Sequence, residues 1–168
     1  MPTVRYPDPE DLPHLPVLLE REVPPEYVDA NGHVNIRHYL ALHDDAGWPF
    51  FERLGMDANH LEQQRSSFFD AENHLRYVAE VLVGNRVRVY GRAIDRSDKA
   101  FHGQWYLFDV TENRLANMFE FVTIHVSLDT RRAVSIPSDI AERIDAHLEH
   151  DRQLPWPAPL SGALGLRR

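Results

Sequence analysis

Cysteine is absent from the 168-residue sequence. Its absence excludes a disulfide scaffold, a zinc ribbon and any thiol nucleophile, and it fits a reducing compartment. Long apolar runs are also missing, because no stretch approaches the ~18 consecutive apolar residues of a membrane span. The first twenty residues carry acidic side chains and five prolines in place of an apolar signal core. We therefore expect a cytoplasmic protein with no membrane partner.

Basic residues are also few in comparison with acidic residues. Lysine and arginine number 18 against 26 aspartates and glutamates, which gives a formal net charge of −8. Nucleic-acid-binding proteins usually carry a basic excess, so we expect no nucleic-acid partner. A His-Glu-x-x-His pattern, a Gly-x-Ser-x-Gly elbow and a phosphate-binding glycine loop are all absent from the sequence. We therefore expect no metal ion and no other cofactor.

Proline marks the two ends of the chain. Eight of the twelve prolines lie within residues 1–16 and 155–159. Because proline fixes φ and removes a hydrogen-bond donor, we expect residues 1–16 to form an N-terminal arm and residues 150–168 a C-terminal tail. The length and the 43% apolar content suit one domain between them, over residues 17–149.

Apolar periodicity predicts one long helix and several strands in this domain. The long helix is expected over 36–54, with Pro49 as its flaw, and short helices over 57–65 and 138–149. Strands are predicted over 17–28, 74–83, 87–94, 100–111 and 115–128, with Gly84-Asn85 as a two-residue hairpin turn. The order predicts an α+β fold in which an antiparallel sheet of about five strands wraps round one long central helix. Such a sheet has open edges, so we expect a homo-oligomer.

Most of the chemical information lies in the stretch Tyr27-Val28-Asp29-Ala30-Asn31-Gly32-His33-Val34-Asn35. In an extended segment, Asp29, Asn31 and His33 point the same way, just before the predicted helix. The free N–H groups and the positive dipole end of a helix start favour negative charge. A carbonyl placed there would be polarised, and Asp29 would act as nucleophile or as base for a water molecule. The same composition is also typical of an ordinary turn that precedes a helix cap.

This motif resembles the hotdog-fold thioesterases. The Asp-x-Asn-x-His-Val-Asn spacing is similar to that of plant acyl-ACP thioesterases, and the Asp-x-x-Gly-x-Val spacing is similar to the 4-hydroxybenzoyl-CoA thioesterase group. The runs 74–84, 97–99 and 135–137 extend the resemblance over residues 17–149. The run 70–77 is similar to thioesterase domains that are found with carnitine dehydrogenase.

The resemblance implies hydrolysis of an acyl-CoA or acyl-ACP thioester by a dimer or tetramer of hotdog protomers, with sites at the dimer interface. Asp29 matches the nucleophile or general base of the family, and Asn31 and His33 match further site residues of the acyl-ACP branch. The backbone amide near Gly32, His33 or Val34 is implied to polarise the thioester carbonyl.

Six further residues are candidates for substrate binding. Aromatic side chains on the predicted helix would wall an acyl pocket or pack in the core. Basic residues in the 86–99 hairpin would meet the phosphates of coenzyme A or form a solvated strand face. A histidine on a predicted strand is either a hydrogen-bonded structural residue or part of the site. The candidates are Tyr39, Trp48, Phe50, His74, Arg96 and Lys99.

Two other functions stay open. A hotdog enoyl-thioester hydratase or dehydratase uses a similar Asp/His pair, with one more residue between its Asn and His than Asn31-Gly32-His33 provides. A non-catalytic acyl-binding protein would be stabilised by ligand without turnover. Release of a free thiol separates the hydrolase from both alternatives.

Overall fold

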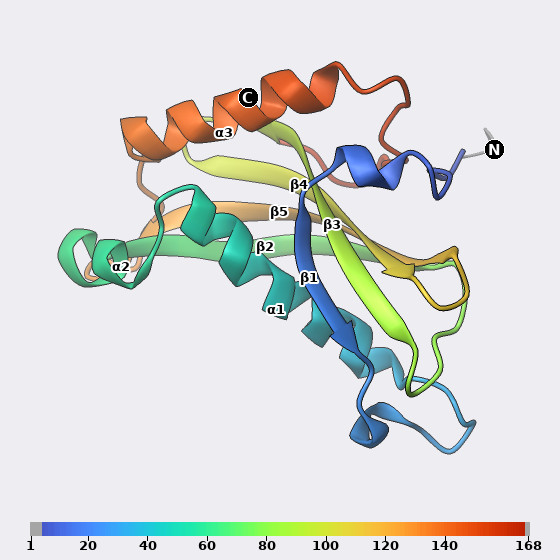
Figure 1. Cartoon of the computed structure of the whole chain (residues 1–168). Coiled ribbons are helices and arrows are strands. Elements are labelled where there is room, and N and C mark those ends of the chain that lie inside the picture. The colour runs from blue at the N-terminus through green and yellow to red at the C-terminus, as the bar shows by residue number, and fades with distance from the viewer. Residues whose placement is uncertain (1–4, 167–168) are drawn as a thin grey trace.

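The computed structural model of the protein describes residues 5–166, so the first four residues of the predicted arm and the last two of the predicted tail lie outside the described residues. The elements are β1 (Val17–Glu22), α1 (Ile36–Arg53), α2 (Ala58–Gln64), β2 (Ser66–Tyr77), β3 (Arg86–Arg96), β4 (Ala100–Asp109), β5 (Arg114–Ser127) and α3 (Ser138–Arg152). Short 3-10 helices at Leu12–His14 and Pro25–Tyr27 flank β1. Figure 1 shows α1 lying across the sheet, with α3 along its upper end.

The five strands form one antiparallel sheet in the order β1-β3-β4-β5-β2. We call the face that packs against α1 and α3 the inner face, and the main hydrophobic core lies there. Alternate residues of a strand point to opposite faces. Trp105 of β4 therefore packs in the main core, while Tyr106 packs with Trp156 in a second cluster on the outer face. The predicted five-stranded α+β fold around one long helix is confirmed.

The long helix α1 is fixed by its cap and by its buried stripe. Oδ1 of Asn35 accepts a hydrogen bond from the N–H of Arg37 at 3.2 Å and caps the helix. The helix continues through Pro49, because packing of its buried side outweighs the missing backbone hydrogen bond. A Cβ at Gly47 would lie 3.0 Å from Cη2 of Trp105, so glycine lets the helix approach the sheet closely. The buried stripe consists of Tyr39, Leu42, Ala46 and Phe50.

The predicted hairpin at Gly84-Asn85 is wrong. Strand β2 ends at Tyr77 and pairs with β5, while β3 pairs with β1 and β4. The chain crosses between β2 and β3 without regular structure, and the N–H of Gly84 donates to the carbonyl of Val23 at 2.9 Å. Local alternation and turn residues cannot reveal which strands pair across the sheet. The predicted first strand also ends early, at Glu22, because two prolines follow it.

The segment after α3 packs on the outer face of its own sheet. Trp156 is 3% exposed, and the guanidinium carbon of Arg92 lies 4.3 Å from the centre of its ring. Nη2 of Arg92 also donates to the carbonyl oxygens of Asp151 and Trp156. The N–H of Ser161 donates to the buried carboxylate of Glu120 at 2.6 Å. The tail therefore covers the side of the sheet that α1 leaves open.

Candidate active site

The motif before α1 folds as a tight turn, where the sequence predicted an extended segment. The N–H of Asp29 donates to the carbonyl of His33 at 2.9 Å, and the N–H of Gly32 donates to the carbonyl of Asp29 at 3.1 Å. Gly32 has a φ of +85°, which suits glycine. A bridge between Val28 and Val34 closes the turn. The chain thus brings its functional groups together by folding back on itself.

Asp29 and His33 lie side by side in this turn. Oδ2 of Asp29 is 3.5 Å from Nδ1 of His33, and the two side chains are 16% and 33% exposed, respectively. Oδ1 of Asp29 accepts a hydrogen bond from the backbone N–H of Asn31 at 2.8 Å. Asn31 is an exposed residue that lines neither cavity described below. Its backbone orients the carboxylate, while its side chain is not brought to the Asp29–His33 pair.

Two of the three backbone amides that were expected to polarise a carbonyl already have acceptors. The N–H of Val34 donates to the carbonyl of Val81 at 2.9 Å, and that of Gly32 is used within the turn. Among residues 5–166, the N–H of His33 has no acceptor. This amide, next to the helix start, is therefore the one available to an oxyanion.

A cavity of about 370 Å³ opens beside the turn. Asp29 and His33 line it together with Tyr39 of α1, whose role in substrate binding stays a prediction. The hydroxyl of Tyr39 accepts a hydrogen bond from the N–H of Val81 at 3.0 Å. Burial raises the pKa of Tyr39, so its phenol stays protonated near neutral pH.

The opposite wall of this small cavity was missed by sequence reasoning. It consists of residues 77–80, which the sequence assigned to the interior of a strand. Glu80 places a second carboxylate in the cavity lining, and Tyr77 packs edge-on against Tyr39 with ring centres 5.2 Å apart. Because residues 78–80 follow the end of β2 in irregular conformation, no periodic signal marks them.

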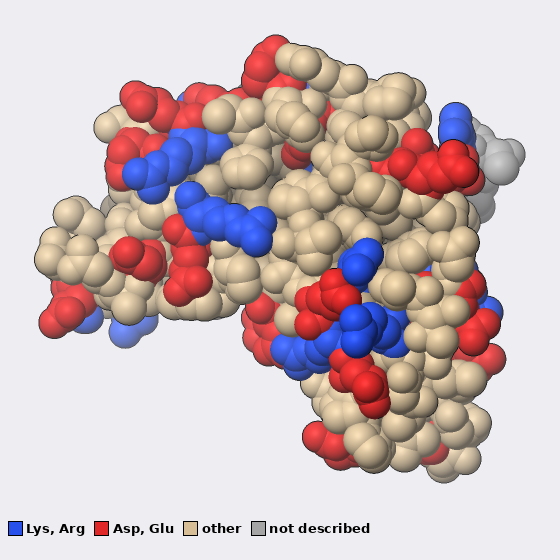
Figure 2. Space-filling view, in the orientation of Figure 1, with Lys and Arg blue, Asp and Glu red and all other residues tan. Residues whose placement is uncertain are grey.

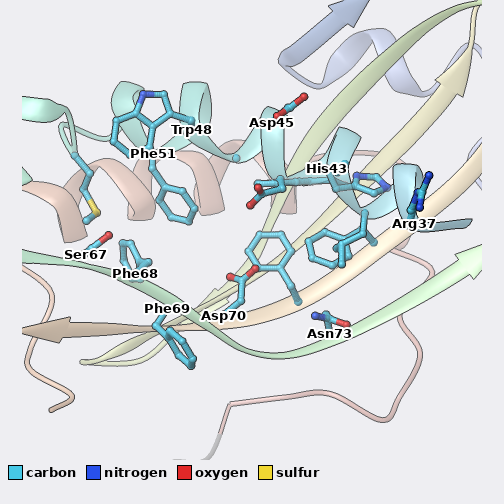
Figure 3. A pocket seen from close by; sticks show the side chains of 18 residues that line it. Arg37, His43, Asp45, Trp48, Phe51, Ser67, Phe68, Phe69, Asp70 and Asn73 are labelled. Carbon is cyan, nitrogen blue, oxygen red and sulfur yellow. The ribbon is translucent and has the colours of Figure 1, made fainter. Parts of the chain in front are cut away.

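A larger cavity of about 860 Å³ lies between α1, β2 and the inner face of the sheet. Trp48 and Phe51 of α1 face Phe68 of β2 across it (Figure 3). Trp105 of β4 also contributes to its wall. The predicted pocket role fits Trp48, whereas Phe50 is buried in the core against Phe101 and does not line the cavity.

His43 is the buried polar residue of this larger cavity. Its Nε2 lies 2.7 Å from Oδ1 of Asn117, and its Nδ1 has no hydrogen-bond partner among the described residues. Burial lowers the pKa of His43 to about 4, so the ring is neutral at neutral pH. No signal in the sequence marked His43 as a residue of the site. Within residues 5–166, no group of three or more potential ligand side chains is placed to hold a metal ion.

The basic residues expected to meet coenzyme A do not gather around Asp29 within one protomer. The loop that carries Asp29 follows the end of β1, which pairs with Arg86 at the start of β3. Arg96 lies at the other end of β3, where its Nε donates to Asp145 of α3 at 2.6 Å. Lys99 is exposed in the turn that follows and has no carboxylate partner in the described chain.

The remaining candidate, His74, lies on β2 opposite Glu120 of β5 and lines neither cavity.

Figure 2 shows acidic and basic side chains interspersed on the face in view, with no continuous basic surface there. No helix within residues 5–166 is long and apolar enough to span a membrane.

Solved structures confirm the fold. A Staphylococcus aureus protein in complex with CoA superposes with a TM-score of 0.80 at 21% identity, over 91% of this chain and 97% of that one. A Thermus thermophilus thioesterase complexed with coenzyme A and Zn gives a TM-score of 0.68 at 24% identity, over 81% of this chain and 96% of that one.

Sequence relatives show the family. A betainyl-CoA thioesterase of Pseudomonas aeruginosa is 30% identical over 147 residues, which are 88% of this chain and 92% of that protein. The L-carnitine dehydrogenase/betainyl-CoA thioesterase of Ruegeria pomeroyi is 28% identical over 94% of this chain, which spans 32% of that longer protein. The model of the thioesterase-like superfamily matches residues 23–144. The predicted enzyme class is thereby confirmed, and the chain belongs to the thioesterase-like superfamily.

Proposed function

We propose that the protein hydrolyses an acyl-CoA thioester at the turn before α1, with Asp29 as nucleophile or general base. The observation that carries the proposal is the Asp29 carboxylate itself. It is part-buried, oriented by one backbone hydrogen bond, and placed beside His33 in a small cavity at a helix start. Relatives that are named betainyl-CoA thioesterases support a CoA thioester as the substrate.

The reaction needs a nucleophile and a site for the developing oxyanion. Asp29 attacks the carbonyl carbon, or it takes a proton from a water molecule that attacks instead. The carbonyl oxygen becomes negative and is stabilised by the free N–H of His33. Collapse breaks the C–S bond, and the thiolate of coenzyme A leaves and takes up a proton. If Asp29 is the nucleophile, water then hydrolyses the mixed anhydride and restores the carboxylate.

We infer that the working unit is a homodimer joined along β2. This strand is one edge of the sheet, and it exposes 65% of Phe69 and 45% of Tyr77. Unpaired backbone groups at a sheet edge favour pairing with another strand. Residues of β2 also line both cavities, so a partner at this edge would complete the site. In this arrangement the domain of residues 17–149 supplies both cavities, and Arg96 and Lys99 of one protomer serve the site of the other.

The test is release of free thiol from a panel of acyl-CoAs that begins with betainyl-CoA. Asp29→Asn keeps an oxygen acceptor for the N–H of Asn31, so we expect an unchanged melting temperature. We expect kcat to fall at least about 100-fold, the usual size of a lost acid–base group. The control is Asp129→Asn, since Asp129 forms an exposed ion pair with Arg65 at 3.1 Å.

Full turnover by Asp29→Asn would contradict the assigned residue and would direct the search to Glu80, the other carboxylate of the small cavity. A change in enoyl absorbance without thiol release would identify a hydratase. Ligand-dependent thermal stabilisation without either reaction would identify a binding protein.

A further inference from the structure

The hydroxyl of Tyr39 carries a proton that the protein itself does not use. Oη of Tyr39 accepts a hydrogen bond from the backbone N–H of Val81 at 3.0 Å. A tyrosine hydroxyl is a donor as well as an acceptor, and within residues 5–166 this one has no acceptor for its own proton. The residue is 4% exposed, yet it lines the small cavity with Asp29 and His33. Its O–H is therefore a buried donor that is left for a molecule in this cavity.

Two hydrogen bonds tie the hydroxyl of Tyr39 to the turn that carries Asp29. Val81 accepts a hydrogen bond from the N–H of Val34 at 2.9 Å through its carbonyl, and its own N–H donates to Tyr39. The nitrogen and the carbonyl oxygen of one residue are only three bonds apart, so Val81 holds Tyr39 and Val34 at neighbouring points. Val34 follows His33, whose N–H has no acceptor in the described chain. Two free donors, one O–H and one N–H, thus belong to the same part of the cavity wall.

Packing fixes the position of the phenol ring before any substrate arrives. Tyr39 lies in the first turn of α1 and belongs to the buried stripe of the helix. Tyr77 packs edge-on against it with ring centres 5.2 Å apart. A donor that is held in place in advance needs no reorganisation when negative charge develops beside it.

The surroundings also keep the proton on Tyr39. Desolvation raises the pKa of Tyr39 with support from the charge of Glu80, and it outweighs the hydrogen bond from Val81, which lowers the pKa. An ordinary thiol has a pKa of about 8.5 and an ordinary tyrosine one of about 10, so transfer of this proton to a leaving thiolate is unfavourable. Tyr39 is therefore suited to donate a hydrogen bond, and not to act as an acid or a base.

We propose that Tyr39 is a catalytic residue, whose O–H forms the oxyanion site of the thioester together with the N–H of His33. The inference rests on the proposed function, because it concerns the carbonyl that Asp29 or its water molecule attacks. As the carbonyl carbon becomes tetrahedral, its oxygen gains negative charge and accepts both hydrogen bonds, while the proton stays on Tyr39. When the C–S bond breaks, the carbonyl forms again and both hydrogen bonds weaken. The two donors thus stabilise the transition state more than the bound substrate.

The first test measures thiol release by Tyr39→Phe, which keeps the ring and removes the donor. We expect kcat to fall about 100- to 1,000-fold, the usual cost of one oxyanion donor, while KM changes less than about threefold. Tyr106→Phe is the matched control, because it removes a buried hydroxyl that donates to Gln104 at 2.7 Å and lines neither cavity. Both variants should melt at a lower temperature, since each leaves a buried polar group unpaired, but only Tyr39→Phe should lose turnover. Wild-type kcat in Tyr39→Phe would overturn the inference.

Replacement of Tyr39 by 3,5-difluorotyrosine separates a catalytic proton from a structural hydroxyl. The fluorinated residue keeps the shape of tyrosine and an oxygen acceptor for Val81, so it tests the inference even if Tyr39→Phe does not fold. Its phenol is more acidic, and an ionised phenol cannot donate. We expect kcat of this variant to fall at alkaline pH values at which the wild type is still active. An alkaline profile identical to that of the wild type would contradict a role for the proton.

Ketone analogues of the acyl-CoA distinguish a failure of this inference from a failure of the proposed function. In these analogues CH₂ separates the sulfur from the carbonyl, so they bind without hydrolysis. A trifluoromethyl ketone forms a tetrahedral adduct, whereas the corresponding methyl ketone stays planar. We expect the wild type to bind the trifluoromethyl ketone more tightly, and Tyr39→Phe to reduce this preference roughly 10- to 100-fold, the effect of one hydrogen bond to a charged group.

An unchanged preference in Tyr39→Phe would overturn the inference. Full turnover by Asp29→Asn, with turnover lost in Tyr39→Phe, would overturn the role of Asp29 alone. Absence of thiol release from any acyl-CoA, with the ketone preference of the wild type reduced in Tyr39→Phe, would overturn the proposed hydrolysis and leave the donor role of Tyr39 intact.

Discussion

The two faces of the sheet differ in the partners that their polar side chains find within the protein. On the outer face, Arg92 is bonded to Asp151 of α3 and to Trp156 of the C-terminal tail, and Glu120 is bonded to Ser161 of the tail. On the inner face, α1 leaves a large cavity lined by Asp44 and Asp70, which form no ion pair within residues 5–166, and by His43, whose Nδ1 has no partner there. The tail covers the outer face, where Nη1 of Arg92 and Nε1 of Trp156 still lack partners within residues 5–166, whereas the inner face keeps an open cavity.

This difference indicates which residues contribute to stability and which contribute to function. Closing a face with a tail buries apolar surface and satisfies polar groups, which stabilises the fold. Leaving charges and polar atoms unpaired costs stability and is typical of sites that bind a ligand. Substitutions beneath the tail should therefore change the free energy of unfolding, and substitutions of exposed residues that line the inner-face cavity should change kinetics.

The two faces each carry a tryptophan, and this pair gives the largest expected effect. Trp156 is 3% exposed on the outer face, whereas Trp48 is 46% exposed in the cavity. Trp156→Ala should lower the free energy of unfolding by about 3–5 kcal/mol, the usual cost of removing a buried aromatic. Trp48→Ala should change it by less than about 1 kcal/mol while raising KM. Urea unfolding measures the free energy of unfolding, and thiol release at low temperature measures KM.

Loss of turnover per folded molecule in Trp156→Ala, at unchanged stability, would contradict this division of the two faces. Such a result would place the tail in the site of a neighbouring protomer. Equal destabilisation by both tryptophan variants would show that the cavity wall is part of the stabilising core.

The pH dependence of stability tests the inner face at His43. Burial lowers the pKa of His43 from 6.5 to about 4, while the weaker effect of its hydrogen bond with Asn117 raises it. The unfolded chain takes up a proton near pH 6.5, but the native ring does not until about pH 4. Stability is therefore complete above pH 6.5, falls as the pH drops through this window, and has lost about 3 kcal/mol at its lower end.

Urea unfolding from pH 4 to 7.5 measures this dependence, with His43→Gln as the matched variant because glutamine can still donate to Asn117. The free energy of unfolding of the variant should lack the fall between pH 6.5 and 4 that His43 causes in the wild type. Burial also lowers the pKa of His125 and His147, so these residues add a background that both proteins share. An identical pH slope in the wild type and in His43→Gln would contradict the assignment.

Features encoded locally were predictable from the sequence. The helical periodicity after Asn35 predicted α1 within one residue of its end at Arg53, and the fold class followed from the order of elements. The convergence of Asp29 and His33 was also predictable, although the reason was not. The left-handed conformation of Gly32 and the backbone hydrogen bonds of the turn bring them together, where alternation in a strand was expected.

Features that depend on distant parts of the chain were not predictable. The polar start of β2 shows no apolar alternation, because this edge strand is mostly exposed, so the cavity residues near Asp70 gave no periodic signal. The basic residues of the 86–99 hairpin appeared as one cluster in the sequence but face different partners. Their partners are Glu20 for Arg86 and Arg88, Trp156 for Arg92, and Asp145 for Arg96.

Glu120 tests how strongly the tail closes the outer face. Burial alone would raise its pKa, but hydrogen bonds with His102 at 3.0 Å and from Ser161 outweigh burial and lower the pKa. The ionised carboxylate therefore stabilises the native state above its usual pKa, and this stability is lost as the pH falls through the lowered value. Glu120→Gln should reduce the free energy of unfolding at pH 7 by about 1–3 kcal/mol and weaken its acid dependence.

Hydrogen exchange at residues 153–166 would locate the effect of Glu120→Gln in the tail, with Glu112→Gln in the exposed β4–β5 turn as the control. Unchanged protection of the tail would contradict the role of Glu120 in holding it. Turnover should be the same in both variants, because neither residue lines a cavity.

The smallest expected effects are those of substituting Arg96 and Lys99, at the end of β3 that lies against α3. Arg96 holds Asp145 of α3 and lowers the pKa of that carboxylate. The pair is partly exposed, so Arg96→Ala should cost at most about 1 kcal/mol of stability. Lys99, which has no such partner in the described chain, should contribute more to binding, and Lys99→Ala should raise KM for an acyl-CoA about two- to fivefold, the worth of one exposed charge contact. If KM rises only in Arg96→Ala, the guanidinium leaves Asp145 for the phosphates of the substrate, and Asp145→Asn should then lower KM by releasing it.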